Sequence, residues 1–461
     1  MYKLDFNKPI NIHFIGIGGI SMSGLAEILL DRGFMISGSD RQESALTKKL
    51  ESNGALIFYG QKAENISDKC DLVVYTAAIH PDNPEYARAK ELGIPLITRA
   101  ELLGQMMMNY RSSIAVSGTH GKTTTTSMLA HILLAADTDP TVSVGGILHA
   151  IDGNIRIGAS DYFLTEACEY TNSFLHFNPT LGVILNVEED HLDFFKDIDD
   201  IRHSFKKFTG LLPKDGALVI NADINDYSYF TKNLPCRVIT YSVDSPADLT
   251  ACDISFNEFA IPSFTAVYKG KELGRFELKV PGRHNISNAL AAIGASLVLG
   301  IDTAMMAKGL SSFTGTDRRF QFKGKINGAS VVDDYAHHPT EIRATLSTAL
   351  KCPHKKLWVI FQPHTYSRTK AFFNDFIDAL SAADEVILAE IYAARETNTF
   401  GVSSADIAKG ISQKGTKASY FPTFKEIEDY IKPQLKAGDL VLTMGAGNVT
   451  AIGDELLKEN D

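Results

Sequence analysis

Residues 114–126 read Ile-Ala-Val-Ser-Gly-Thr-His-Gly-Lys-Thr-Thr-Thr-Thr. An apolar, β-branched run leads into a turn framed by Gly118 and Gly121, and helix-compatible residues follow from 127 to 136. This order predicts a strand, a phosphate-binding loop and a helix. Glycines let backbone N–H groups approach a polyphosphate, and a helix N-terminus carries partial positive charge.

The same loop carries the two side chains that a phosphate site needs. In such a loop Lys122 reaches the β- and γ-phosphates, and the Thr123 hydroxyl binds Mg²⁺. The general pattern has a glycine where Val116 stands, so an ordinary strand–turn–helix with an exposed lysine is the alternative interpretation. Gly-Lys-Thr between a strand and a helix favours the phosphate loop.

Length and composition are those of a globular protein. The chain has 461 residues, of which 44% are hydrophobic and 22% charged, with a formal net charge of −10. This length predicts about three domains of ~150 residues each. The negative charge and the lack of a Lys/Arg block argue against binding to nucleic acid.

The cysteines and the N-terminus indicate where the protein works. Five cysteines lie far apart, without a C-x-x-C pair, which favours a reducing compartment over a disulfide framework. Residues 1–9 have no long apolar run, and no apolar segment reaches the ~18 residues of a membrane span. We therefore expect a cytoplasmic protein that does not insert into a membrane.

Residues 1–108 alternate between strand and helix patterns, which predicts a parallel, doubly wound, Rossmann-like sheet. The first turn contains Gly16, Gly18 and Gly19, and Ser21 stands at the third glycine position of a dinucleotide fingerprint. The glycines either bind the diphosphate of a nucleotide or only permit tight packing of strand against helix.

Asp40 ends the second predicted strand and has two interpretations. In a Rossmann-like domain the acid at this place accepts a hydrogen bond from a ribose hydroxyl. It is equally suited to cap a helix that begins at Gln42.

Residues 109–315 are the second predicted domain, a parallel sheet of the phosphate-loop ATPase type. Two of its predicted strands, 160–167 and 181–187, end near Glu166 and His191. Ligands gather beyond the carboxyl ends of parallel strands, and Mg²⁺ prefers oxygen ligands. Each side chain alone is more typical of a solvated surface group. Beside the phosphate loop, they predict a metal site.

The third predicted domain spans residues 316–461, after a Gly/Thr linker at 313–317 that follows two helices. The first helix, 286–300, has Asn285 as its expected cap. Strands again alternate with helices and end in polar clusters, so this domain is also expected to be Rossmann-like.

Taken together, these motifs resemble the Mur ligase family of peptidoglycan synthesis. The likeness rests on residues 118–125, Glu166-Ala167, Asp190-His191, 282–285 with Asn288, Arg318-Arg319-Phe320, and Asp334-Tyr335 with His337, Pro339 and Glu341. It covers the whole chain in three-domain order. The resemblance implies a UDP-sugar-binding domain at 1–108, an ATP-binding domain at 109–315 and an amino-acid-binding, closing domain at 316–461.

A further stretch is more specific within that family. Phe361-Gln362-Pro363-His364 with Ser367-Arg368-Thr369 is similar to the member that attaches the first amino acid. The resemblance implies that ATP phosphorylates the lactyl carboxylate of UDP-N-acetylmuramate and that L-alanine then displaces phosphate. Three alternatives remain: a ligase that attaches a preformed tripeptide, a non-catalytic nucleotide-binding protein, and a nicotinamide oxidoreductase based on residues 16–24 alone.

The resemblance also implies roles for individual residues, with ATP and Mg²⁺ as cofactors and a monomer or weak homodimer. Expected ATP-binding residues are Gly118, Thr119, His120, Gly121, Lys122, Thr123, Thr124, His284, Asn288 and Arg319. Expected metal ligands are Thr123, Glu166 and His191. Expected substrate-binding residues are Gly16, Gly18, Gly19, Tyr335, His337, His364 and Arg368. Expected catalytic residues are Lys122, His191, Arg319 and His337.

Overall fold

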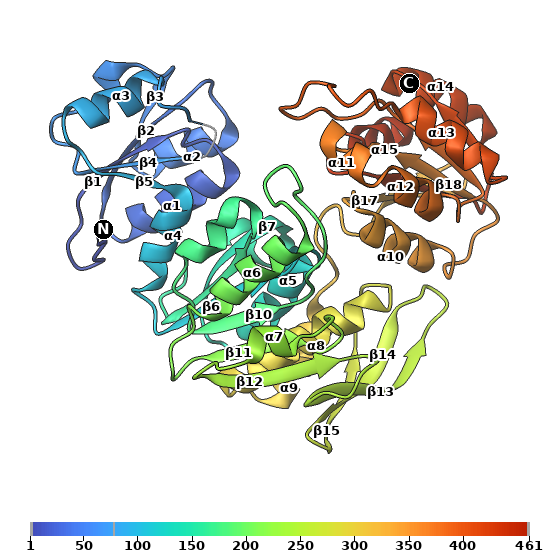
Figure 1. The fold of residues 1–461 in the computed structure, drawn as a ribbon, viewed down its shortest axis with the longest axis horizontal. Helices are drawn as coiled ribbons and strands as arrows, with labels where there is room; N and C mark the ends of the chain where they lie inside the picture. Colours follow the sequence, from blue (N-terminus) through green and yellow to red (C-terminus); the bar gives the residue numbers. More distant parts are fainter. Residues whose placement is uncertain (1–2, 77–78, 459–461) are drawn as a thin grey trace.

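The computed structural model describes residues 3–76 and 79–458, and its chain is arranged around three sheets (Figure 1). The first sheet has the order β3-β2-β1-β4-β5, and every neighbouring pair is parallel. Its strands are β1 (Asn11–Ile15), β2 (Met35–Asp40), β3 (Leu56–Tyr59), β4 (Leu72–Tyr75) and β5 (Leu96–Thr98). Its helices are α1 (Ile20–Asp31), α2 (Ala45–Ser52), α3 (Pro84–Glu91) and α4 (Arg99–Met107), with a short η1 (Ala63–Asn65). The predicted doubly wound sheet is confirmed.

The interpretation of Asp40 as a helix cap is wrong. Helix α2 begins at Ala45, and the Ser44 side chain accepts a hydrogen bond from the Thr47 N–H. The Asp40 carboxylate instead accepts a 2.8 Å hydrogen bond from the Gly18 N–H. Asp40, in β2, therefore stabilises the glycine turn that follows the neighbouring strand β1.

The central sheet has ten strands in the order β15-β14-β13-β12-β11-β10-β6-β9-β7-β8. The strands are β6 (Ser112–Ser117), β7 (Thr141–Leu148), β8 (Gly153–Arg156), β9 (Tyr162–Ala167), β10 (Leu181–Ile184), β11 (Ala217–Asn221), β12 (Arg237–Ser242), β13 (Leu249–Phe256), β14 (Pro262–Tyr268) and β15 (Lys271–Glu277). From β13 to β7 the sheet is parallel, and antiparallel pairs extend both edges. The helical segments are α5 (Lys122–Ala135), η2 (His149–Ile151), η3 (Tyr170–His176), α6 (Ile198–Thr209), α7 (Ser228–Thr231), α8 (His284–Leu299) and α9 (Thr303–Ser312).

Two predicted helix starts in this part of the chain are wrong. Helix α5 begins at Lys122 and not at Ser127, so the threonines after the lysine are already helical. Helix α8 begins at His284 without a side-chain cap, and Asn285 lies inside its first turn, where its amide donates to the Pro281 carbonyl at 2.7 Å. Both starts are set by backbone turns rather than by a polar cap residue.

The third sheet has the order β16-β17-β21-β18-β19-β20 and is parallel except for the edge strand β16. Its strands are β16 (Gln321–Ile326), β17 (Ala329–Asp334), β18 (Leu357–Phe361), β19 (Glu385–Leu388), β20 (Lys417–Tyr420) and β21 (Leu440–Met444). Its helices are α10 (Pro339–Ala349), α11 (Tyr366–Ala371), α12 (Phe373–Leu380), α13 (Ser404–Gln413), α14 (Phe424–Ile431) and α15 (Thr450–Leu457), with η4 (Lys432–Gln434). Separate hydrophobic clusters cover its two faces.

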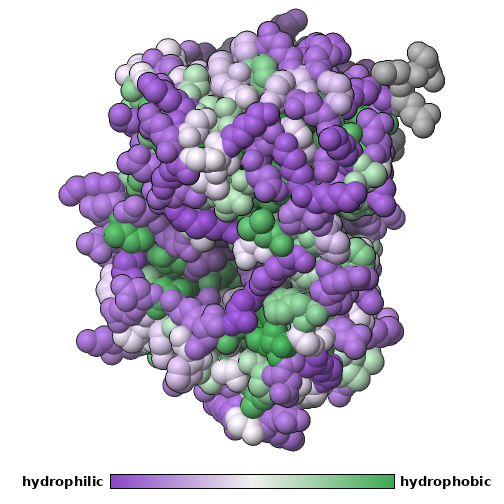
Figure 2. All heavy atoms as spheres, turned by 90° about the vertical axis from the view of Figure 1, so that its right-hand side faces the viewer, coloured by the Kyte–Doolittle hydropathy of each residue, from purple (hydrophilic) through white to green (hydrophobic). Residues whose placement is uncertain are grey.

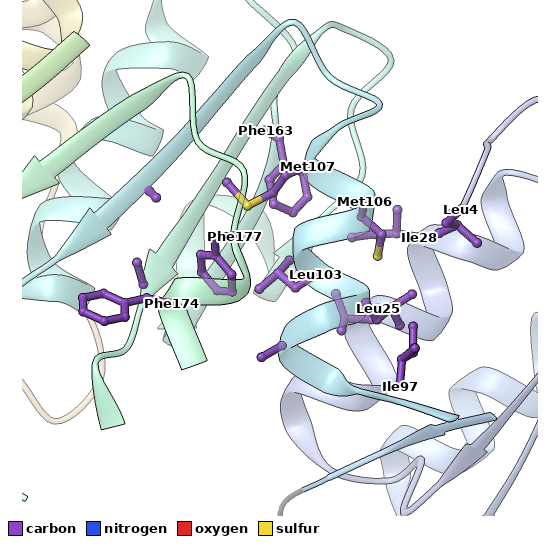
Figure 3. Packing of buried hydrophobic residues seen from close by; sticks show 14 of the residues in the cluster. Leu4, Leu25, Ile28, Ile97, Leu103, Met106, Met107, Phe163, Phe174 and Phe177 are labelled. Carbon is purple, nitrogen blue, oxygen red and sulfur yellow. The ribbon is translucent and has the colours of Figure 1, made fainter. Parts of the chain in front are cut away.

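Helix α4 joins the first sheet to the central sheet through one continuous core. Figure 3 shows Leu103 of α4 between Leu25 of α1 and Phe177 of the central domain, and all three are buried. A Cβ atom on Gly104 would lie 1.8 Å from the His176 carbonyl oxygen, so this helix approaches the central domain as closely as a glycine allows. The sequence pattern of residues 1–108 does not predict α4. This helix nevertheless determines how the first two domains pack together.

The surface between the central and third sheets is hollowed. Figure 2 shows hydrophobic side chains in a recess between an upper and a lower half of an otherwise mainly hydrophilic face. Among the described residues, no helix combines the length and the apolar composition that crossing a bilayer requires.

Candidate active site

The phosphate loop lies between β6 and α5, at the centre of the ten-stranded sheet. Strand β6 pairs with β9 on one side and with β10 on the other, and Val116 lies opposite Glu166. Gly121 adopts φ 81°, and a Cβ atom there would lie 2.7 Å from the Asn288 side-chain oxygen. Only glycine satisfies both the left-handed backbone and the close approach of α8. The predicted strand, loop and helix are therefore present.

Lys122 is folded back into its own loop in this structure. Its Nζ donates to the carbonyl oxygens of Gly118 at 2.5 Å and Thr119 at 3.1 Å, and it lies 3.0 Å from the Glu169 carboxylate. Burial alone would lower the pKa of Lys122, but the charge of Glu169 raises it above its usual range. The lysine is thus a permanent cation beside the loop.

Glu169 was not among the predicted site residues, although it follows Glu166 in the acidic run after β9. It is buried, and it faces Lys122 at 3.0 Å and the His191 Nε2 at 3.9 Å. The position of Glu169, three residues after the predicted metal ligand Glu166, was the sequence signal that could have identified it. The sequence does not show that a side chain beyond the end of β9 turns back toward the lysine.

The three expected metal ligands lie around the same end of the sheet. Thr123 is in the first turn of α5, and Glu166 near the end of β9 accepts a 2.5 Å hydrogen bond from the Gly145 N–H. His191 has a left-handed backbone, with φ 52°, and its ring stacks on Tyr170 at 4.4 Å. One hydroxyl and one carboxylate near a phosphate loop are a donor set suited to Mg²⁺, which keeps several water ligands.

A cavity of about 190 Å³ lies between the phosphate loop, the N-terminal part of α8 and the third domain. Its walls include His284, Asn288 and Arg319, three of the expected ATP-binding residues. Burial, and next the charge of Arg319, lower the pKa of His284 to about 4. A neutral imidazole and an amide are groups that can recognise the edge of a nucleobase through hydrogen bonds.

Side chains from the third domain close over the phosphate loop at His120. Its Nδ1 lies 3.2 Å from Glu341, its Nε2 lies 3.6 Å from Glu188, and its ring lies 4.6 Å from the ring of His338. The His338 Nε2 also lies 2.9 Å from the Glu189 carbonyl oxygen. His338 therefore has a structural role at the start of α10 and in the contact between domains.

The stability of this closed arrangement is expected to depend on pH through His120. Burial alone would lower the pKa of His120, but Glu341 and Glu188 raise it from 6.5 to about 9. A raised folded-state pKa stabilises the protein fully below pH 6.5, and the stabilisation is lost as the pH rises through 9. Relative to a His120→Asn variant, the wild-type free energy of unfolding should fall by about 3 kcal/mol between pH 6.5 and pH 9.5.

Urea denaturation of the wild type and the variant at each pH measures this difference. Groups that titrate alike in both proteins contribute equally to the two free energies of unfolding, so their contributions cancel. A difference between wild type and variant that stays constant from pH 6.5 to pH 9.5 would contradict a charged His120 in the contact.

A second cavity, of about 830 Å³, holds the expected amino-acid site. Its walls come from residues near the ends of β9 and β10 and from the third domain, including Asp190, His191, His364 and Arg368. Arg368 donates through Nε and Nη2 to Asp190 at 3.1 and 2.6 Å, and its Nη1 lies 3.2 Å from the His364 Nδ1. Burial would raise the pKa of Asp190, but Arg368 holds it well below its usual range.

Tyr335 and His337 precede α10 and are not among the described residues that line this cavity. The His337 Nδ1 lies 3.1 Å from the Tyr335 carbonyl oxygen and 3.2 Å from Glu341, and its ring lies 5.9 Å from that of His364. Burial lowers the pKa of His337 to about 3, so the ring is neutral at pH 7. Arg319 lies over the Tyr335 ring at 5.2 Å and 3.9 Å from Glu341.

The first glycine turn lies in the N-terminal domain. The structure explains part of it by packing and does not test whether it binds a diphosphate. Gly16 adopts φ 84°, and a Cβ atom on Gly18 would lie 2.8 Å from Asp40. Tight packing therefore explains Gly18. Gly19 is the N-terminal cap residue of α1 and has no side-chain cap bond. Diphosphate binding at this turn stays a prediction.

The structure connects the expected phosphate and amino-acid sites by a continuous series of polar side-chain contacts. Lys122 faces Glu169, Glu169 faces His191, and His191 lies 3.7 Å from Asp190, which binds Arg368. Residues more than 240 positions apart in the sequence thus line one region between two domains. Glu169 and Asp190 are the carboxylates in this series, and Glu188 and Glu341 are the carboxylates beside His120. The predicted site did not include these four residues.

Three family descriptions match successive parts of the chain. Residues 11–111 match the Mur ligase family catalytic domain, residues 116–296 the Mur ligase middle domain, and residues 318–447 the Mur ligase glutamate ligase domain. With the relatives below, they establish the class: the chain belongs to the Mur ligase family.

Within that family, the chain is similar along its length to several UDP-N-acetylmuramate–L-alanine ligases. The UDP-N-acetylmuramate–L-alanine ligase of Agathobacter rectalis is 60% identical over 459 residues, which cover 100% of both chains. That of Lachnospira eligens is 58% identical and covers 99% of this chain and 100% of its own. The solved structure of the UDP-N-acetylmuramate-alanine ligase from Thermotoga maritima matches with a TM-score of 0.80 at 32% identity, covering 97% of this chain and 98% of that chain. A murein peptide ligase from Psychrobacter arcticus gives a TM-score of 0.69 at 26% identity, with coverage of 97% and 98%.

Proposed function

We propose that this chain is an ATP-dependent ligase that joins L-alanine to the lactyl carboxylate of UDP-N-acetylmuramate, in the cytoplasm, as a step of peptidoglycan precursor synthesis. The observation that supports the proposal is the series of contacts from Lys122 to Arg368, which joins the loop that carries Lys122 to the cavity beside Arg368. Full-length relatives at 58–60% identity that carry this activity as their name support the choice of substrates.

The reaction needs activation of a poor electrophile. A carboxylate does not react with an amine until one of its oxygens becomes a leaving group, which transfer of the γ-phosphoryl group from ATP provides. The resulting acyl phosphate is attacked by the amine of L-alanine, and phosphate leaves with the C–O bond electrons. Lys122 stabilises the charge on the phosphoryl group during transfer.

Thr123, Glu166 and His191 are the residues that would hold Mg²⁺. When bound, the ion supplies charge neutralisation beside the β- and γ-phosphates. His191 also lies 3.9 Å from Glu169, the partner of Lys122. In the proposed site, movement of Lys122 toward a phosphate would therefore free Glu169 to pair with His191.

The C-terminal groups are proposed to bind the amino acid and to close the cleft. Arg368 uses one edge of its guanidinium for Asp190 and directs Nη1 toward His364. The second edge is suited to a carboxylate such as that of L-alanine. His337 is neutral, with Nδ1 directed at Tyr335 and Glu341, so its Nε2 is proposed to accept a hydrogen bond from the attacking amine.

The proposal also covers the domain limits, the nucleotide contacts and the oligomeric state. We propose domain limits of 1–108, 109–315 and 316–461, with His284, Asn288 and Arg319 at the nucleotide. A monomer or weak homodimer is the proposed state, with no nucleic-acid partner.

A phosphate-release assay tests the function. Purified protein receives ATP, Mg²⁺ and UDP-N-acetylmuramate with L-alanine, with a preformed tripeptide, or with no acceptor. We expect release above the single-substrate blanks only with L-alanine. Release with tripeptide alone would identify the alternative ligase, and nucleotide binding without turnover would favour the non-catalytic alternative.

A further inference from the structure

Arg99 lies where the first two domains meet. It is the first residue of α4, and its Nη1 donates a 3.0 Å hydrogen bond to the Ser21 hydroxyl. Ser21 is in the first turn of α1, directly after the glycine turn that ends at Gly19. The guanidinium therefore lies against the loop in which a diphosphate is expected.

The charge of Arg99 has no carboxylate to balance it. Within residues 3–76 and 79–458, no acidic side chain comes within 4.0 Å of its guanidinium, whereas Arg368 pairs with Asp190 and Arg318 with Asp333. The Arg99 side chain is only partly exposed, so water does not fully solvate the cation, and burial lowers its pKa. A partly desolvated cation without a counter-charge is costly unless a ligand supplies one.

Arg99 also lies within electrostatic range of the Cys168 side chain, which follows the end of β9. The guanidinium therefore lies between the first glycine turn and the end of β9 in the central sheet.

The support beneath Arg99 is rigid. Thr98 caps α4 through a reciprocal pair of hydrogen bonds with Glu101. Buried side chains of α4, such as Leu103, pack in the core that both domains share. An arginine fixed in this way is pre-organised for one anion position.

We propose that Arg99 binds an anionic group of the sugar nucleotide, through phosphate or carboxylate oxygens, between the glycine turn and the phosphate loop. The inference rests on the proposed function, because it takes UDP-N-acetylmuramate as the substrate. Either the diphosphate or the lactyl carboxylate supplies the oxygens. The planar guanidinium suits both, and each makes a charge-assisted pair.

Calorimetric titration of the full chain tests this subsite with three ligands: UDP-N-acetylmuramate, UDP-N-acetylglucosamine, which lacks the lactyl carboxylate, and ATP. We expect Arg99→Gln to weaken binding of UDP-N-acetylmuramate about 50-fold and to change ATP binding less than about twofold. An equal loss for UDP-N-acetylglucosamine identifies the diphosphate as the partner. A loss confined to UDP-N-acetylmuramate identifies the carboxylate.

Matched variants separate binding from folding. Arg111→Gln removes an exposed arginine that follows the C-terminal end of α4. Ser21→Ala removes the hydrogen bond to Arg99 but keeps the charge of Arg99. Both should bind UDP-N-acetylmuramate within about fivefold of wild type. If Arg99→Gln does not fold, Arg99→Lys takes its place, with an expected loss of about tenfold.

An Arg99 variant that folds and binds UDP-N-acetylmuramate within twofold of wild type would overturn the inference alone. Failure of the wild type to bind UDP-N-acetylmuramate would overturn the proposed function as well, so the two failures are distinguishable.

Discussion

Replacing Lys122 with methionine is expected to lower kcat by about 10³-fold or more. Methionine keeps much of the length and the apolar stem of lysine but removes the cation that lies within hydrogen-bonding distance of the loop carbonyls and Glu169. Charge that develops on the transferring phosphoryl group would then lose the stabilisation that the Lys122 ammonium is proposed to supply. The KM for L-alanine should change little, because Arg368 and His364 are unaltered.

Steady-state phosphate release measures this effect, with Lys207→Met as a control at an exposed lysine of α6. Removing one member of a buried ion pair costs about 3–5 kcal/mol of stability, so circular dichroism must first show that the variant is folded. A Lys122→Met/Glu169→Gln variant also removes the carboxylate left without its partner. A kcat within tenfold of the Lys207 control, in either Lys122 variant, would remove the lysine from the transition state.

The structure around Lys122 shows which features sequence predicts well. The phosphate loop, the parallel first sheet, the strand that carries Glu166 and the strand that precedes His191 all follow local patterns of apolar, glycine and polar residues. The start of α5 does not. Four β-branched threonines after Lys122 weaken the local helix signal, and the left-handed Gly121 begins the helix there.

Contacts between domains could not be predicted from local patterns. Arg368 and Asp190 are 178 residues apart, and His338 and Glu189 are 149 apart. Such distances depend on how α4 and the 313–317 linker orient three separate sheets. The sequence predicts which chemical groups lie at each strand end, but the choice of partner across the cleft is a property of tertiary packing.

The contact between Arg368 and Asp190 leads to the second prediction with a large expected effect. Replacing Arg368 with alanine is expected to lower kcat/KM for L-alanine by about 10³-fold. The change removes the proposed donor to the amino-acid carboxylate and leaves the buried Asp190 without its guanidinium, which is 2.6 Å away in the structure. Initial rates over a range of L-alanine concentrations measure the effect, with Arg343→Ala as a control in an exposed ion pair with Asp375.

An Asp190→Asn variant distinguishes two ways in which Arg368 could act. If Arg368 binds the amino acid, its removal should raise the KM for L-alanine far more than Asp190→Asn does, because the second guanidinium edge survives in that variant. If Arg368 acts only by holding the third domain against the central domain, Arg368→Ala and Asp190→Asn should change the KM values for all three substrates to a similar extent. Wild-type KM for L-alanine in Arg368→Ala would contradict the direct role.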